Sequence, residues 1–352
     1  MSLAALTTTQ FWTTIGDRVW DKLSGEEGLT MLLIWCTVLI AGVITYVKIT
    51  PEARSVRGLI AHIFPREIFT NRYARVDFLF WLSRKLVLPI FVVPLIFSTV
   101  TAGHAMYWLL TQIFGAPTHA AGQAGPFVLC IFTLTMLLAY DLSYYIYHYA
   151  QHKVPMLWEL HKVHHSAEIM IGVTKDRVHP LDELMNHWWD GVIPGLCYGV
   201  WLFFVLDPVE LTVFGINVYL LRNVILMMDF VRHTHLKLSY GRALDSVFLS
   251  PHYHQLHHSS QEPHLDKNFG LALSIWDRMF GTLVHPKPNE SFVFGLTHDE
   301  HLEYQTVYCL HVLPLKKMAL RVRAAAHRQL RRRRRDQTAV MPPAAPASKS
   351  NA

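Results

Sequence analysis

Three stretches decide the fold of this chain: His148-Tyr-Ala-Gln-His152, His161-Lys-Val-His164-His165 and His254-Gln-Leu-His257-His258. Positions i, i+3 and i+4 of a helix lie on one face, so each stretch predicts imidazoles that point in one direction. Histidine is the commonest protein metal ligand, because neutral imidazole offers a lone pair without a charge to bury. These eight histidines predict a site that surrounds two metal ions.

A simpler interpretation of each histidine is a packing residue that forms hydrogen bonds. The chain has 22 histidines among 352 residues, so some clustering arises by chance. Two copies of H-x-x-H-H and one H-x-x-x-H are much harder to produce at random. We therefore favour the metal interpretation for all eight.

The composition is that of a membrane protein. Hydrophobic residues make up 51% of the chain and charged residues 16%, with a mean hydropathy of +0.22, whereas about a quarter of the residues in soluble proteins are charged. Several stretches approach the ~20 residues that cross a bilayer. The expected spans are Leu29 to Val47, a stretch within Leu86 to Phe114, Phe127 to Tyr147, Trp188 to Leu206 and Val209 to Met228. The sequence thus predicts an all-α, multi-pass membrane protein, with a tight turn at Asp207-Pro208 between the last two spans.

Basic residues set the expected orientation. Lysines and arginines are frequent from Lys48 to Lys85, after the first span, whereas Gly115 to Gly125 has no charged residue. Because basic loops stay in the cytoplasm, we expect the first loop to be cytoplasmic. Counting crossings from there places all three histidine stretches on the cytoplasmic side.

The two ends of the chain differ in character. Residues 1–27 show no secretory signal and are expected to lie along the membrane interface. After about Leu315 the chain becomes strongly basic, with an unbroken run from Arg331 to Arg335 before an Ala/Pro/Ser tail. We expect these arginines to contact anionic lipid head groups and the last dozen residues to be disordered. Nucleic acid binding is disfavoured, because no aromatic interleaving or binding motif accompanies the run.

Further polar residues are candidates for holding the metal ligands in place. A ligating imidazole usually donates its second N–H to a carboxylate, a carbonyl or water. His233 lies four residues after Asp229, where the last span ends, which makes it the expected ninth ligand. We expect a supporting role for His187, whereas the sequence assigns none to His179 or His235. The candidate carboxylates are Asp141, Glu159, Asp182, Glu183 and Asp229.

With these motifs in place, the chain resembles the fatty acid hydroxylase and sterol desaturase superfamily of integral membrane di-iron enzymes, which share H-x-x-x-H followed by two H-x-x-H-H motifs. Trp158 to Ser166 resembles the central block of that family, and Arg177-Val-His179-Pro180 resembles the R-x-H-P that follows it. Asp266-Lys-Asn-Phe-Gly270 and Trp276 to Thr282 are similar to its closing segment. The resemblance covers about Phe127 to Thr282.

The resemblance implies a cytoplasmic helical cap over the spans, with the histidines holding two iron ions, which zinc can replace in purified protein. It also implies a membrane lipid as substrate, reached through a channel that opens into the bilayer. Asp229 stands where some members carry a further histidine, so this part of the shell departs from the family pattern.

The chemistry expected of such a site is the oxidation of an unactivated C–H bond, which needs the strong oxidant that a metal cofactor supplies. We expect an oxygen-dependent lipid hydroxylase acting on an acyl chain or a sphingolipid type of substrate. The alternative is a sterol or lipid desaturase or C-methyl oxidase on the same scaffold. The sequence has no G-x-G-x-x-G loop and no cysteine set for an iron–sulfur cluster, so electrons are expected from a separate ferredoxin or cytochrome with its reductase.

Two non-enzyme alternatives are a haem protein and a metal-binding or transport protein. Adjacent pairs such as His164-His165 are wasteful for axial haem ligation. Transporters place polar ligands near the middle of the membrane, and the expected spans are nearly free of them.

We expect three regions along the chain. Residues 1–126 form an N-terminal membrane region with the first spans, residues 127–290 a catalytic domain, and residues 291–352 a basic, disordered tail. The expected location is a bacterial inner membrane, or the ER membrane in a eukaryote, with the active site facing the cytoplasm.

Overall fold

The structure is a computed structural model that describes residues 26–49, 54–92, 99–117, 125–205, 228–287 and 290–340. Four expectations lie outside the described residues: the interfacial N-terminal segment up to residue 25, the Asp207-Pro208 turn, nearly all of the Val209 to Met228 span, and the last dozen residues.

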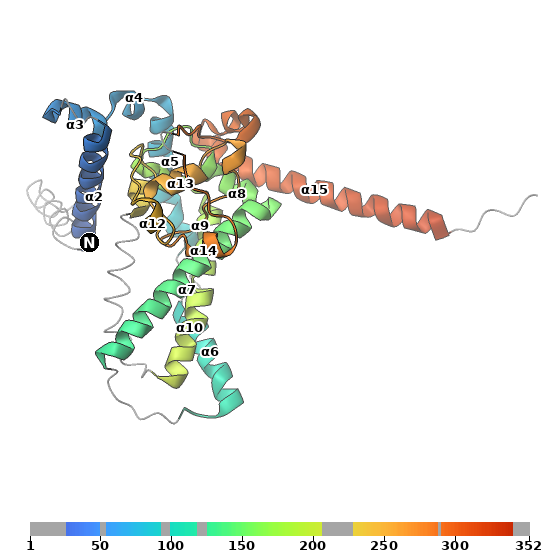
Figure 1. The fold of residues 1–352 in the computed structure, drawn as a ribbon. Coiled ribbons are helices and arrows are strands. Elements are labelled where there is room, and N and C mark those ends of the chain that lie inside the picture. The colour runs from blue at the N-terminus through green and yellow to red at the C-terminus, as the bar shows by residue number, and fades with distance from the viewer. Residues whose placement is uncertain are drawn as a thin grey trace, which may run out of the picture.

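The described part of the chain is all-α, as predicted (Figure 1). Its extended pairings are two isolated bridges, Phe248 with Leu273 and Ser259 with Phe294. The α-helices are α2 Glu26–Ile49, α3 Val56–Ile63, α4 Arg66–Phe69, α5 Arg72–Val92, α6 Thr99–Phe114, α7 Pro126–Lys153, α8 Pro155–His165, α9 Pro180–Asp190, α10 Val192–Phe204, α12 Arg242–Asp245, α13 Pro251–His257, α14 Ile275–Met279 and α15 Val307–Val340. The 3-10 segments are η2 Gly172–Asp176, η3 Glu262–His264 and η4 Thr297–Tyr304.

In the described part of the chain, two helices are long and apolar enough to cross a membrane. The apolar segments are Met31–Ile49 in α2 and Phe127–Lys153 in α7. Only 28% and 22% of their most apolar windows are buried, whereas the core helix of a soluble protein would be mostly buried. These apolar helices indicate that the chain associates with a membrane.

Two other expected spans coincide only in part with the described helices. The range within which one was expected, Leu86 to Phe114, contains the end of α5 and helix α6, and residues 93–98 between them lie outside the described part. Gly191 separates α9 from α10, which leaves only 13 residues in α10. At 1.5 Å per residue such a helix covers roughly 20 Å, less than the ~30 Å hydrocarbon core. The multi-pass topology therefore stays a prediction.

Helices α6 and α10 pack so closely that their backbones touch. A Cβ added to Gly199 would lie 2.4 Å from the carbonyl oxygen of Gly103, so both positions need the absence of a side chain. Small residues at helix contacts are typical of membrane bundles, where close approach replaces the hydrophobic driving force. Figure 1 shows α6, α7 and α10 extending together away from the remaining helices.

Helix α7 carries the chain from this bundle to the histidines. His148 and His152 lie near its C-terminal end, and Pro155 begins the next helix. A residue before proline is disfavoured in the helical conformation, and Val154 is accordingly extended, with ψ 114°. The chain turns there, so α8 packs back against α7 and the first two histidine stretches face each other.

One buried cluster draws on all three predicted regions of the chain. Phe80 of α5, Val163 of α8 and Leu310 of α15 pack together with Leu296 and Tyr304. This core crosses the predicted boundaries at 126 and 290, so the three-region division stays a prediction about sequence character.

The prediction of a disordered tail from residue 291 is wrong for the described residues, because residues 307–340 form α15. Leucine, alanine, lysine and arginine dominate this segment, and all four favour helix. Burial of Leu310 in the shared core anchors the start of the helix.

The Leu310→Ala variant should lose about 2–5 kcal/mol of stability, because Leu310 is fully buried and truncation leaves a cavity. Leu320→Ala is the matched control, since Leu320 is 53% exposed on the same helix. Thermal unfolding of both variants in detergent measures the difference. Equal melting temperatures would show that α15 is not anchored through Leu310.

Candidate metal centre

The structure brings all nine predicted histidines together in two adjacent groups. The larger group contains His148, His152, His161, His165 and His257. The smaller group contains His164, His233, His254 and His258. Within each group the possible ligand atoms lie within 4.8 Å of one another, a spacing at which they can surround a metal ion.

The Nε2 atoms of the imidazoles point toward one another. In the smaller group, Nε2 of His233 lies 3.2 Å from Nε2 of His164 and 3.1 Å from Nε2 of His254. In the larger group the Nε2 atoms of His152 and His165 are 3.1 Å apart. A cation between such lone pairs can bind all of them, whereas a proton can satisfy only one pair.

Several imidazole nitrogens facing the centre are buried without a hydrogen-bond partner. They include Nε2 of His148, His161 and His257. Buried polar atoms are nearly always paired, so unpaired nitrogens converging on one point call for an explanation. Metal coordination supplies one, and the donor set therefore fits two metal ions.

One loop, residues 266–270, orients three imidazoles of the larger group. Nδ1 of His148 donates to the carbonyl oxygen of Phe269, and Nδ1 of His257 donates to that of Lys267, both at 2.7 Å. Nδ1 of His152 lies 3.3 Å from Oδ1 of Asp266. A proton held on Nδ1 leaves the Nε2 lone pair free for a metal ion, so the loop selects the ligating tautomer.

The loop keeps its shape through buried polar side chains. Asp266 and Asn268 have φ of 58° and 57°, a left-handed conformation that aspartate and asparagine tolerate better than most residues. The Asn268 amide donates to the carbonyl oxygens of Tyr253 and Val284. The Asp277 carboxylate accepts the backbone N–H groups of Phe269 and Gly270, both at 2.8 Å.

A second carboxylate ties the same segment to α7. Asp141 accepts the backbone N–H groups of Ala272 and Leu273 and the indole N–H of Trp276. The D-K-N-F-G and W-D-R-M-F-G-T stretches singled out in the sequence thus form the support of the larger histidine group.

Of the five candidate carboxylates, Asp182 accepts directly from a group member. Its Oδ2 lies 3.3 Å from Nδ1 of His161, and its Oδ1 accepts from Gln151 and Tyr147. Burial raises the pKa of Asp182 to about 7. Asp229 accepts from Nδ1 of His233 mainly through its backbone carbonyl oxygen, at 2.8 Å, with its carboxylate 3.6 Å away.

Two other candidate carboxylates bind basic side chains and no imidazole of either group. Glu159 pairs with Lys162 and Arg321, and Glu183 pairs with Arg84. The sequence did not indicate which backbone carbonyls would hold the imidazoles of His148, His233 and His257, because a carbonyl belongs to every residue and leaves no compositional signal.

Burial also prepares six of the clustered imidazoles for metal binding. It lowers the pKa values of these groups well below the usual value for histidine, so they are neutral at pH 7. The groups are His161, His164, His165, His254, His257 and His258.

Three other histidines named in the sequence analysis, His179, His187 and His235, lie outside both groups. His187 has a side chain 45% exposed and lies 3.8 Å from Glu183. Nε2 of His179 bonds to the carbonyl oxygen of His311, and Nε2 of His235 bonds to that of His62. None of the three imidazoles is part of either histidine group.

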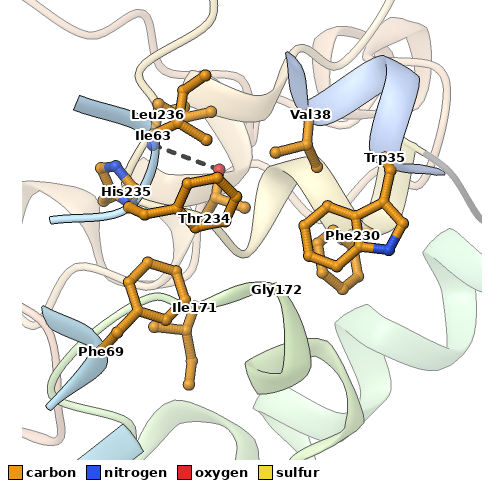
Figure 2. Close-up of a pocket in the computed structure, with 11 residues that line it drawn as sticks. Trp35, Val38, Ile63, Phe69, Ile171, Gly172, Phe230, Thr234, His235 and Leu236 are labelled. Carbon is orange, nitrogen blue, oxygen red and sulfur yellow. Dashed lines mark hydrogen bonds between the residues drawn. The ribbon is translucent and has the colours of Figure 1, made fainter. Parts of the chain in front are cut away.

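Figure 2 shows a small apolar pocket lined by residues from α2 and from the segment that follows His233. Two of its lining residues, Thr234 and His235, directly follow His233, and Trp35 and Val38 come from the candidate span in α2. A Cβ on Gly172 would lie 1.9 Å from the Phe230 ring, so the Phe230 ring can pack here only against a glycine. The full lining is Trp35, Val38, Ile63, Phe64, Phe69, Ile171, Gly172, Phe230, Thr234, His235 and Leu236.

A family model described as fatty acid hydroxylase matches residues 132–282, which contain every member of both histidine groups. Over these residues the chain is similar to the fatty acid hydroxylase and sterol desaturase superfamily. The match agrees with the range of about 127–282 over which the sequence resembles that family.

Curated relatives share this hydroxylase domain. Alkylglycerol monooxygenase of Homo sapiens is 31% identical over 161 residues, which are 46% of this chain and 32% of the relative. The Danio rerio enzyme of that name is 30% identical over 165 residues, with 46% and 32% covered. Ornithine lipid hydroxylase OlsE of Rhizobium tropici is 27% identical over 161 residues, with 46% and 44% covered. The chain thus spans between 32% and 44% of the length of these relatives. No solved structure matches it.

The Asp182→Asn variant should bind metal about 10–100-fold more weakly, because the charge that supports the His161 imidazole is lost while the shape is kept. Competition for Zn²⁺ between the detergent-solubilised chain and a chelator measures the change. Glu262→Gln, at an exposed position, is the control and should bind like the parent chain. Unchanged affinity in Asp182→Asn would mean that Asp182 does not support a ligand.

Proposed function

We propose that the two histidine groups hold two iron ions and that the chain is a membrane-bound, oxygen-dependent lipid hydroxylase. The observation that carries this proposal is the convergence of nine imidazoles in two adjacent groups, whose Nε2 atoms approach one another, with Nδ1 of His148 and of His257 bonded outward to backbone carbonyls. Bound iron would supply the oxidant that an unactivated C–H bond requires. Zinc could occupy the same ligands in purified protein.

The reaction proposed is the conversion of R–H, O₂, two electrons and two protons into R–OH and water. The electrons would come from a separate donor, a ferredoxin or a cytochrome with its reductase. The protein's own contribution is to hold the metal ions in a dry, neutral shell and to place the substrate beside them. The loop at residues 266–270, the Asp182 carboxylate and the backbone of Asp229 keep the imidazoles in position.

The substrate proposed is a membrane lipid with a polar head and an apolar chain, of the acyl or sphingolipid type. Relatives named for alkylglycerol and ornithine lipid support a lipid substrate. Sterol or lipid desaturation remains the alternative, and relatives named as hydroxylases or monooxygenases favour hydroxylation.

We further propose a multi-pass arrangement in a bacterial inner membrane, or in the ER membrane of a eukaryote, with the active site toward the cytoplasm. The basic segment after the first span and the arginine run near the C-terminal end support this orientation. The same run is proposed to contact anionic lipid head groups.

Replacing His164 or His257 by Ala should remove bound iron and abolish hydroxylation, because each variant takes one ligand from one group. His187→Ala is the matched control, since its imidazole lies outside both groups. Metal analysis of detergent-purified chains, with membrane insertion checked in parallel, gives the readout. Full iron content in His164→Ala and His257→Ala would overturn the metal assignment.

Comparative mass spectrometry of lipids from cells with and without the chain tests the reaction. A lipid heavier by about 16 Da would support hydroxylation, and one lighter by about 2 Da would support desaturation instead. About two irons per chain should accompany either product. Unchanged lipids in iron-replete cells with an active electron donor would contradict both.

A further inference from the structure

Helix α15 is held at its start by a group of charges that includes the histidine-bearing helix α8. Arg321 lies 2.5 Å from the carboxylate of Glu159, which is only 1% exposed. Lys162 and Lys317 both bind Oε1 of Glu300, at 2.7 and 2.6 Å. One face of the first turns of α15 therefore packs against the rest of the protein through these ion pairs.

A different face of α15 carries an apolar stripe that the described part of the protein does not cover. Leu315, Val322 and Leu330 are 46%, 56% and 55% exposed. At roughly 100° per residue these positions fall within about 80° of one another, with Ala319 and Ala326 between them. Lys317 and Arg321 lie on roughly the opposite side of α15. Their ion pairs with Glu300 and Glu159 therefore leave the stripe exposed.

The rest of the helix surface is strongly basic. From Leu315 to Arg335 the chain has ten lysines and arginines and no acidic residue. An apolar stripe flanked by basic residues is typical of helices that lie in the plane of a membrane surface, with the stripe in the acyl boundary and the cations among phosphates.

We propose that α15 beyond Arg321 is an interfacial helix that lies on an anionic bilayer surface through the stripe Leu315, Val322 and Leu330. The chain already associates with a membrane through α2 and α7, so the bilayer is nearby. Figure 1 shows α15 leaving the core close to α8 and running across the direction of α6, α7 and α10. This inference goes beyond lipid hydroxylation, and it holds or fails independently of that activity.

An acidic carrier protein is the competing occupant of such a basic helix. Charge alone would suit either partner. The stripe favours the bilayer, because Leu315, Val322 and Leu330 offer a narrow apolar line rather than a compact patch for a folded protein.

The test uses the full chain in nanodiscs, with its four cysteines replaced by alanine and a single fluorescent label. Val322→Cys places the label on the stripe, and Ala324→Cys, two residues away, places it on the opposite face. The discs contain phosphatidylcholine alone, or equal parts phosphatidylcholine and phosphatidylglycerol, with brominated acyl chains as the quencher. Iron content, measured on each variant, checks that the core is intact.

We expect the Val322→Cys label to be quenched several-fold more than the Ala324→Cys label in the anionic discs. Replacing Arg331 to Arg335 by Gln should reduce this difference without changing iron content. Equal quenching at the two positions would overturn the proposal. Protection of the Val322→Cys label that appears only after an acidic ferredoxin is added would overturn it in favour of protein docking.

Discussion

Hydrogen bonds that fix the ligand imidazoles from outside are the interaction on which the rest of the structure depends. Nine neutral imidazoles in a buried space are stable only if each has a defined acceptor or a metal ion to bind. His148 and His257 meet carbonyl oxygens at 2.7 Å, and His161 meets the Asp182 carboxylate. The loop at residues 266–270, with its two left-handed residues, exists in this shape because it supplies such acceptors.

The same requirement explains why the two histidine groups are assembled from distant parts of the chain. Helix α7 carries histidines out of a candidate span, and Pro155 turns the chain so that α8 adds its own. The short helix α13 completes both groups with His254, His257 and His258. Arg177 then fixes the end of α8 by donating to the Val163 carbonyl and the Ser166 hydroxyl. Segments far apart in the chain therefore have to meet before either histidine group is complete.

Much of the candidate site could be predicted from sequence because its residue types are rare and regularly spaced. Histidine at i, i+3 and i+4 marks a helix face, and His233 follows from its position at a span end. The supporting groups were harder to predict. Glu159 lies between two motif segments, yet its carboxylate binds Lys162 and Arg321 rather than an imidazole. A charged side chain has many possible partners, and only packing selects among them.

The sequence by itself determined the helical class, the nine histidines and the family resemblance, because apolar periodicity and the histidine motifs are local patterns. The tertiary structure alone decided how the nine divide into groups of five and four, since adjacent His164 and His165 point to different groups. It also decided that residues 307–340 form a helix anchored by Leu310, where composition had suggested disorder. In both cases the outcome depends on contacts between residues far apart in the chain, whose energies no local pattern contains.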